Sequence, residues 1–157
     1  MILKPNSNIS ESGDLFTVFL AGSIEMGKAE NWQEVIEDEI EIELSGDICL
    51  FNPRRDDWDP SWKQDISHPQ FNQQVNWELD ALNKSDLIVF YFSPDTQSPI
   101  TLLEFGLFAE SGKIVVCCND GFWRKGNIDI VCHKFDIPQV GSVSELINYI
   151  KNYKHGR

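Results

Sequence analysis

The sequence predicts an α/β domain in which a mostly parallel, five-stranded sheet carries helices on both faces. Short apolar runs typical of buried strands alternate with segments whose apolar residues recur at helical spacing. The alternation repeats about five times, and successive parallel strands require crossover connections that are usually helices. With 157 residues, of which 41% are hydrophobic, the chain suits one domain, 1–157, with a substantial core.

Apolar runs almost free of polar residues predict strands in the centre of the fold. They lie at residues 15–20, 48–51, 87–92 and 113–118, and residues 128–135 contain a predicted fifth strand. Residues 1–14 are polar, although Ile2 and Leu3 can add a short edge segment.

Helices are predicted where apolar residues recur every three or four positions, which places them on one face. They lie at residues 31–44, 71–85 and 142–153, and in a segment that ends at Gly112. No G-x-G-x-x-G or G-x-x-x-x-G-K-[ST] phosphate loop follows the first strand, so ordinary dinucleotide-binding and P-loop proteins lose support. The element order favours a flavodoxin-like three-layer α/β/α sandwich with right-handed crossovers.

Charge and cysteine content restrict the partners. The 13 basic and 25 acidic residues give a net charge of -12, which repels polymeric nucleic acids and anionic membranes. A small neutral nucleoside is not excluded, because it responds mainly to its local pocket. The 4 cysteines lack C-x-x-C spacing and predict neither zinc nor disulfides. Without a leader or a long apolar run, we expect a cytoplasmic protein.

Glu104 follows the apolar run 87–92 by a short loop, so it is expected near the carboxyl end of the sheet, where open α/β sheets bind ligands. Two interpretations are open. In Thr101-x-x-Glu104 the acid can serve as a capping box. Alternatively, Ser98-Pro99 starts the helix three residues earlier, which leaves Glu104 in the second turn and free to face a ligand.

Glu78 is a second candidate acid. In the predicted helix 71–85, Val75, Leu79 and Leu82 form the inward stripe, and Glu78 lies about 60° from Val75 at its border. A carboxyl group there can have a raised pKa that suits proton transfer. The alternative is an edge acid that reaches water.

Residues 52–62 form a long loop that contains Arg54, Arg55, Trp58 and Trp62. Long irregular loops are often lids or binding loops, and indole rings stack well on planar bases. The alternative is that the two Trp side chains only hold the loop on the body of the domain.

Several segments together resemble the nucleoside 2-deoxyribosyltransferases, in particular their shorter, divergent branch. The resemblance spans roughly residues 16–116. It is carried by Phe19-Leu20-Ala21-Gly22-Ser23-Ile24, Asn52-Pro53-Arg54-Arg55, Trp77-Glu78-Leu79-Asp80 with Ser85-Asp86, and Ser98-Pro99-Ile100-Thr101 leading to Glu104-Phe105-Gly106.

The resemblance implies that Glu104, in the family's E-x-G motif, is the nucleophile on C1′ of deoxyribose. Glu78 matches the family's acid, usually Asp, so its longer side chain is a departure. A second departure is Ser98, where classical transferases carry an Asp that contacts the base. The loop and the resemblance together give the expected substrate-binding residues, which are Phe19, Ala21, Gly22, Ser23, Asn52, Arg54, Arg55, Trp58, Trp62 and Ser98.

The expected reaction cleaves the N-glycosidic bond through a deoxyribosyl ester of Glu104, which a second base then opens. The expected partners are a nucleoside and a free nucleobase, and no metal or organic cofactor is needed. The family commonly forms homo-oligomers whose chains complete each other's sites. Tyr149 and Tyr153 can serve a neighbour in this way or pack on their own domain.

Two other functions stay open. Ser23 and Ser98 resemble residues of the related deoxynucleoside 5′-monophosphate N-glycosidases, where water opens the intermediate. Those hydrolases carry an Arg where this chain has Glu25, and an acid there would repel phosphate. A non-catalytic nucleotide-binding module is the remaining possibility, because the fold alone does not imply catalysis.

Overall fold

The computed structural model describes residues 1–24, 31–55 and 57–156. Across these residues, parallel strands form one six-stranded sheet in the order β1-β3-β2-β4-β5-β6. The strands are β1 (Ile2–Leu3), β2 (Phe16–Gly22), β3 (Ile48–Phe51), β4 (Leu87–Phe92), β5 (Ile114–Cys118) and β6 (Gln139–Val140). The helices are a short 3₁₀ helix η1 (Ile9–Ser12), α1 (Trp32–Leu44), α2 (Pro69–Lys84), α3 (Pro99–Phe108), α4 (Lys125–Lys134) and α5 (Val143–His155).

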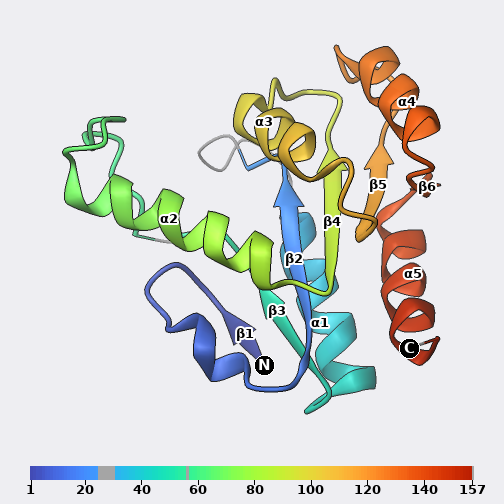
Figure 1. Cartoon of the computed structure of the whole chain (residues 1–157), viewed down its shortest axis with the longest axis horizontal. Helices are drawn as coiled ribbons and strands as arrows, with labels where there is room; N and C mark the ends of the chain where they lie inside the picture. The colour runs from blue at the N-terminus through green and yellow to red at the C-terminus, as the bar shows by residue number, and fades with distance from the viewer. Residues whose placement is uncertain (25–30, 56, 157) are drawn as a thin grey trace.

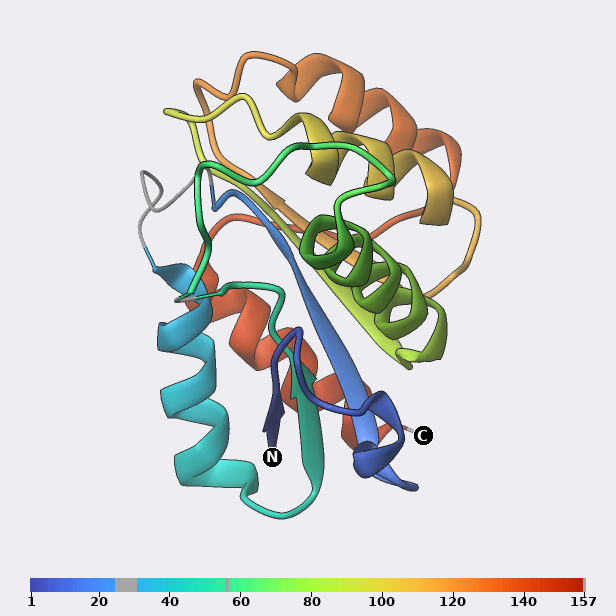
Figure 2. The same ribbon diagram turned by 90° about the vertical axis from the view of Figure 1, so that its left-hand side faces the viewer.

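The sheet is the middle layer of a sandwich, which confirms the predicted fold class. Over the described residues it has six strands instead of the predicted five, because Ile2–Leu3 pairs with β3 as an additional edge strand. Helices α1 and α5 cover one face, whereas α2, α3 and α4 cover the other (Figures 1 and 2). Without the two-residue edge strand β1, the strand order is the 2-1-3-4-5 order of flavodoxin-like folds. None of the described helices has the length and apolar character needed to cross a membrane.

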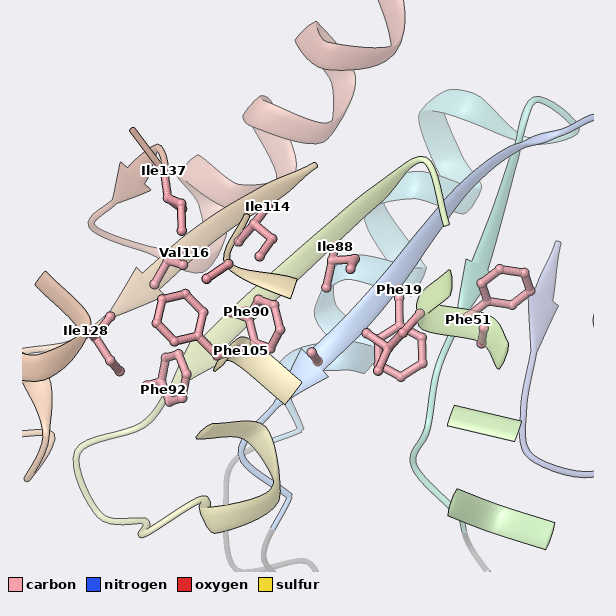
Figure 3. Close-up of a cluster of buried hydrophobic side chains, with 14 of the residues drawn as sticks. Phe19, Phe51, Ile88, Phe90, Phe92, Phe105, Ile114, Val116, Ile128 and Ile137 are labelled. Carbon is pink, nitrogen blue, oxygen red and sulfur yellow. The ribbon is translucent and has the colours of Figure 1, made fainter. Parts of the chain in front are cut away.

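Strand β2 shows how the alternation of side chains builds two cores. Phe19 and Ala21 point toward the layer of α2, α3 and α4, while Val18 and Leu20 point toward α1 and α5. The first core is rich in aromatic rings, and Figure 3 shows Phe105 of α3 beside Phe90 and Phe92 of β4. This packing fixes α3 on the sheet.

The prediction of a strand within residues 128–135 was wrong, because this segment belongs to helix α4. Ile128 and Cys132 are buried, whereas Ile130 between them is 71% exposed. Burial therefore follows a spacing of four rather than two. The strand beside β5 is β6, which pairs through Val116↔Gln139 and Cys117↔Val140.

The other elements agree with the prediction to within a few residues at their ends. β2 extends to Gly22, two residues beyond the expected run, and the edge segment at Ile2–Leu3 is a true strand. Tyr149 and Tyr153 stack on one another at 5.8 Å between ring centroids and pack against their own domain.

Candidate active site at the carboxyl edge of the sheet

The carboxyl ends of β2 and β4 lie side by side and form the topological switch point of the sheet. From β2 the chain crosses to β3 on one side, and from β4 it crosses to β5 on the other. The crossover helices α1 and α3 therefore leave on opposite faces. Open α/β sheets bind ligands in the crevice outside such a point.

Glu104 is held at this edge by helix α3. The helix begins at Pro99, so Glu104 lies in its second turn, and the capping-box interpretation of Thr101 was wrong. Thr101, Glu104 and Phe105 form the buried face of the helix, with Glu104 8% exposed. Before the helix, Ser98 has φ 48° and ψ 51°, a left-handed conformation that costs a serine free energy.

Glu78 approaches from helix α2. The buried face of this helix is formed by Gln74, Trp77, Ala81 and Leu82, whereas Val75 and Leu79, two members of the predicted stripe, are only partly buried. The stripe prediction was therefore wrong by about one position. The shift brings Glu78, one turn after Gln74, closer to the buried face than expected.

The charge of Glu78 acts on Glu104. Burial, followed by the negative charge of Glu78, raises the pKa of Glu104 to about 8. Burial raises the pKa of Glu78 to about 7, and a hydrogen bond from Gln74 opposes this rise. Their carboxyl groups are therefore close enough for one charge to act on the other. At a pH between these values the pair holds one proton and one negative charge.

Three hydroxyl groups form a buried cluster at the ends of β2 and β4. Ser23 Oγ lies 2.7 Å from both Thr96 Oγ1 and Ser98 Oγ, and the latter two lie 2.8 Å apart. Ser23 Oγ also accepts a hydrogen bond from the Ser93 backbone N–H. Two of the three, Ser23 and Ser98, were predicted site residues. Thr96 was missed, although it lies in the loop after β4.

The other predicted residues of β2 are closely packed. Phe19 and Ala21 are fully buried, and Phe19 packs against Trp77 of α2. At Gly22, an added Cβ would lie 2.5 Å from the indole of Trp32 and 2.6 Å from the Tyr91 carbonyl oxygen. The glycine is thus required by close packing as well as by any approach of a ligand.

Asn52 and Arg54 form a polar network where β3 ends. Asn52 donates to Glu37 Oε1 and accepts from the Arg54 backbone N–H. The Arg54 guanidinium donates to the side-chain oxygens of Asn31 and Gln33. This network joins the loop after β3 to the beginning of α1.

Arg55 organises the Trp-containing loop. Its Nε and one terminal nitrogen bind both carboxylate oxygens of Asp57 at 2.8 Å, and its guanidinium lies 4.9 Å from the Trp62 ring centre. Trp58 packs edge-on against Trp62 at 5.1 Å. Figure 1 shows the outer part of this loop extending past the beginning of α2. The Trp side chains thus contact residues of their own loop, and these contacts do not decide between the two interpretations of the loop.

Gln74 is the other site residue that sequence reasoning missed, since a lone Gln in a polar helical segment gives no signal. Its amide lies between Glu78 and the loop. Glu25, on which the comparison with the hydrolases depended, lies outside the described residues. Among the residues that the structure describes, no group of three or more His, Cys, Asp or Glu side chains is placed to hold a metal ion.

Comparisons with known proteins identify the family and the fold of the chain. A family model described as "nucleoside 2-deoxyribosyltransferase like" matches residues 15–122, which include both acids and the hydroxyl cluster. A crystal structure of a conserved protein from Enterococcus faecalis V583 superposes with a TM-score of 0.63 at 17% identity, covering 88% of this chain and 99% of that chain. That likeness supports the fold alone. A search of curated proteins gave no significant match.

Proposed function

The chain belongs to the nucleoside 2-deoxyribosyltransferase-like family, and from this premise we propose that it transfers deoxyribose between bases. The enzyme would cleave the N-glycosidic bond of a 2′-deoxynucleoside, hold the sugar as an ester of Glu104, and pass it to a second base. The observation that carries the proposal is that Glu104, on the helix that follows β4, is buried within reach of the charge of a second, partly buried acid, Glu78 of α2.

The reaction requires one carboxylate and one proton donor. As the C1′–N bond breaks, its electron pair leaves with the base, and a Glu104 oxygen forms the new bond to C1′. The departing base takes up a proton, which the acid pair supplies. Because Glu104 has the higher pKa, the shared proton has to move to Glu78 or to the base before Glu104 attacks. The second base then bonds to C1′, releases Glu104 and gives up a proton.

Exclusion of water decides between transfer and hydrolysis, because water can also open the ester. The loop that contains Trp58 and Trp62 is the proposed lid, joined to the acid pair through Arg55 and Gln74. We expect Trp62→Leu to raise the share of free deoxyribose among the products. Lys63→Ala, an exposed neighbour, is the control, and equal product ratios in both variants would remove the lid from the proposal.

The hydroxyl cluster bears on whether the substrate is a nucleoside or a nucleotide. The three side chains are buried and hydrogen-bonded to one another: Ser23, Thr96 and Ser98. A 5′-phosphate bound here would have to replace these short contacts. This supports a nucleoside as the substrate. The second candidate is hydrolysis of a deoxynucleoside 5′-monophosphate, because Ser23 and Ser98, the two residues that resemble the N-glycosidases, lie together.

Incubation with deoxyinosine and adenine, followed by chromatography, tests the proposal. We expect deoxyadenosine and hypoxanthine from the wild-type protein. Glu104→Gln is expected to lose at least about 10³-fold in rate, because the amide cannot form the ester. Glu110→Gln, an exposed acid just after the same helix, is the matched control and keeps its activity.

The other products identify the alternatives. Free deoxyribose without deoxyadenosine indicates a hydrolase, and a parallel reaction with deoxyinosine monophosphate then shows whether it prefers the nucleotide. Unchanged substrates in both reactions favour a binding module. A fully active Glu104→Gln variant would remove Glu104 from the chemistry.

A further inference from the structure

Gln74 forms a bridge between one of the two acids and the loop. It is 5% exposed and lies one turn before Glu78 on α2. Its Nε2 donates to Glu78 Oε1 at 2.6 Å and to the Pro53 carbonyl oxygen at 3.1 Å. Its Oε1 accepts from the Arg55 guanidinium at 3.4 Å. All three neighbours therefore converge on one buried amide.

Two of these neighbours fix the orientation of the amide. A backbone carbonyl such as that of Pro53 can only accept a hydrogen bond, and a guanidinium can only donate. The NH₂ group of Gln74 therefore faces Pro53, and its oxygen faces Arg55. With the amide fixed in this way, Gln74 presents an N–H to Glu78, and the Oε1 atom of Glu78 has to accept it.

We propose that Gln74 is a positioning residue that keeps Glu78 the anionic member of the acid pair and leaves the shared proton on Glu104 in the ligand-free protein. A hydrogen bond donated to a carboxyl oxygen stabilises the ionised form more than the neutral form. Glu104 has no equivalent donor among its described hydrogen bonds, and it is more deeply buried. The hydrogen bond from Gln74 therefore adds to the difference in burial and favours the ionised form of Glu78 over that of Glu104.

The charged groups around Glu78 are consistent with this role. Glu104, on the facing helix α3, is the acid with which Glu78 interacts. Arg55 is the nearest cation in the hydrogen-bond chain, but its charge is paired with Asp57. Arg55 therefore orients Gln74 more than it stabilises Glu78 directly. The catalytic role of Gln74 rests on the proposed function. The protonation states of Glu78 and Glu104 do not depend on that function.

Titration of the carboxyl groups by ¹³C NMR of protein labelled at its Glu residues tests the inference without any turnover. Gln74→Met keeps the length of the side chain and removes the donor. We expect the titration midpoint of Glu78 to rise by about one pH unit or more, the size expected for one hydrogen bond to a charged group. Gln73→Met is the control. Gln73 also accepts a hydrogen bond from Arg55, but the hydrogen bond to Glu78 comes from Gln74. Its variant should leave the midpoint unchanged.

A measurement on the wild-type protein covers the case in which Gln74→Met does not fold. The side-chain amide signals of Gln74 should shift with pH at the midpoint of Glu78, and those of Gln73 should not. An unchanged Glu78 midpoint in folded Gln74→Met, or Gln74 signals that ignore the titration of Glu78, would overturn the inference. Because neither result involves catalysis, failure of the proposed function would show only in the product assay.

Discussion

At the residue scale, Glu78 and Glu104 are placed where ionisation is costly, and this has a consequence for stability. Both have pKa values in the fold, about 7 and about 8, above the ordinary value of 4.5. The folded protein therefore binds more protons than the unfolded chain in this range. Their contribution to stability is fully present below about pH 4.5 and is lost as the pH rises through about 7 to 8.

Glu78→Gln tests this coupling. The substitution removes the charge that raises the pKa of Glu104, so we expect the Glu104 midpoint to fall. It also removes one of the two acids whose ionisation destabilises the fold, so the free energy of unfolding near about pH 8 should increase by about 1 kcal/mol or more. Urea unfolding at a mildly acidic and a mildly alkaline pH measures the effect. Glu110→Gln serves as control, and identical pH slopes in the two variants would contradict the coupling.

At the element scale, a glycine at the end of a strand and a glycine within a helix have opposite packing. Gly22 ends β2 against Trp32 and the Tyr91 carbonyl, whereas a Cβ at Gly106, in the middle of α3, meets no described atom within 4 Å. We expect Gly22→Ala to cost about 2–3 kcal/mol through overpacking. Gly106→Ala should stabilise by about 0.5–1 kcal/mol, since Gly is a poor helix former. Chemical denaturation measures both, and similar free energies of unfolding would refute the packing at Gly22.

The elements also show what the sequence could predict. The apolar runs that became β2, β3, β4 and β5 are buried on both faces, so their composition alone identifies them. In contrast, the apolar residues of α4 alternate in sequence as they would in a strand, at Ile128, Ile130 and Cys132. Only the folded structure shows that Ile130 faces away from the sheet while the other two are buried. β6 has two residues and is defined by its pairing with β5, so no local pattern identifies it.

For the site, Glu104 was predicted because it follows a recognisable strand, Glu78 because it borders the apolar stripe of its helix, and Ser23 and Ser98 through the family resemblance. Gln74 was not predicted, since two of its hydrogen-bond partners, Pro53 and Arg55, come from the loop after β3 rather than from its own helix. Hydrophobic periodicity cannot detect a polar side chain whose burial is made possible by hydrogen-bond partners elsewhere in the fold. This is also why the predicted stripe of α2 was displaced.

At the scale of the whole molecule, the outer face of α3 is an exposed apolar surface. It consists of Ile100, Leu103 and Leu107, which are 59%, 59% and 60% exposed. The helix has one charged residue, Glu104, which is buried. In a chain of net charge -12, this uncharged face is a suitable contact between two copies. We therefore propose that the protein forms a homo-oligomer through α3.

Leu103→Lys tests the proposed assembly. The exposed position should tolerate Lys with little loss of monomer stability. We expect sedimentation velocity to give a multiple of the chain mass for the wild-type protein and a smaller species for the variant. Lys63→Ala, outside this face, is the control. A wild-type protein that sediments as a monomer would contradict the assembly.

The central claim is that Glu104 carries the sugar, and the most direct measurement is mass spectrometry of protein trapped during turnover. A 2-fluoro-2-deoxyribosyl nucleoside, whose fluorine slows the opening of the ester, is a suitable probe. The expected result is one added sugar per chain, located by peptide mapping on Glu104 and absent in Glu104→Gln. Turnover of deoxyinosine with the probe attached to another residue, or with no adduct on the protein, would contradict the claim.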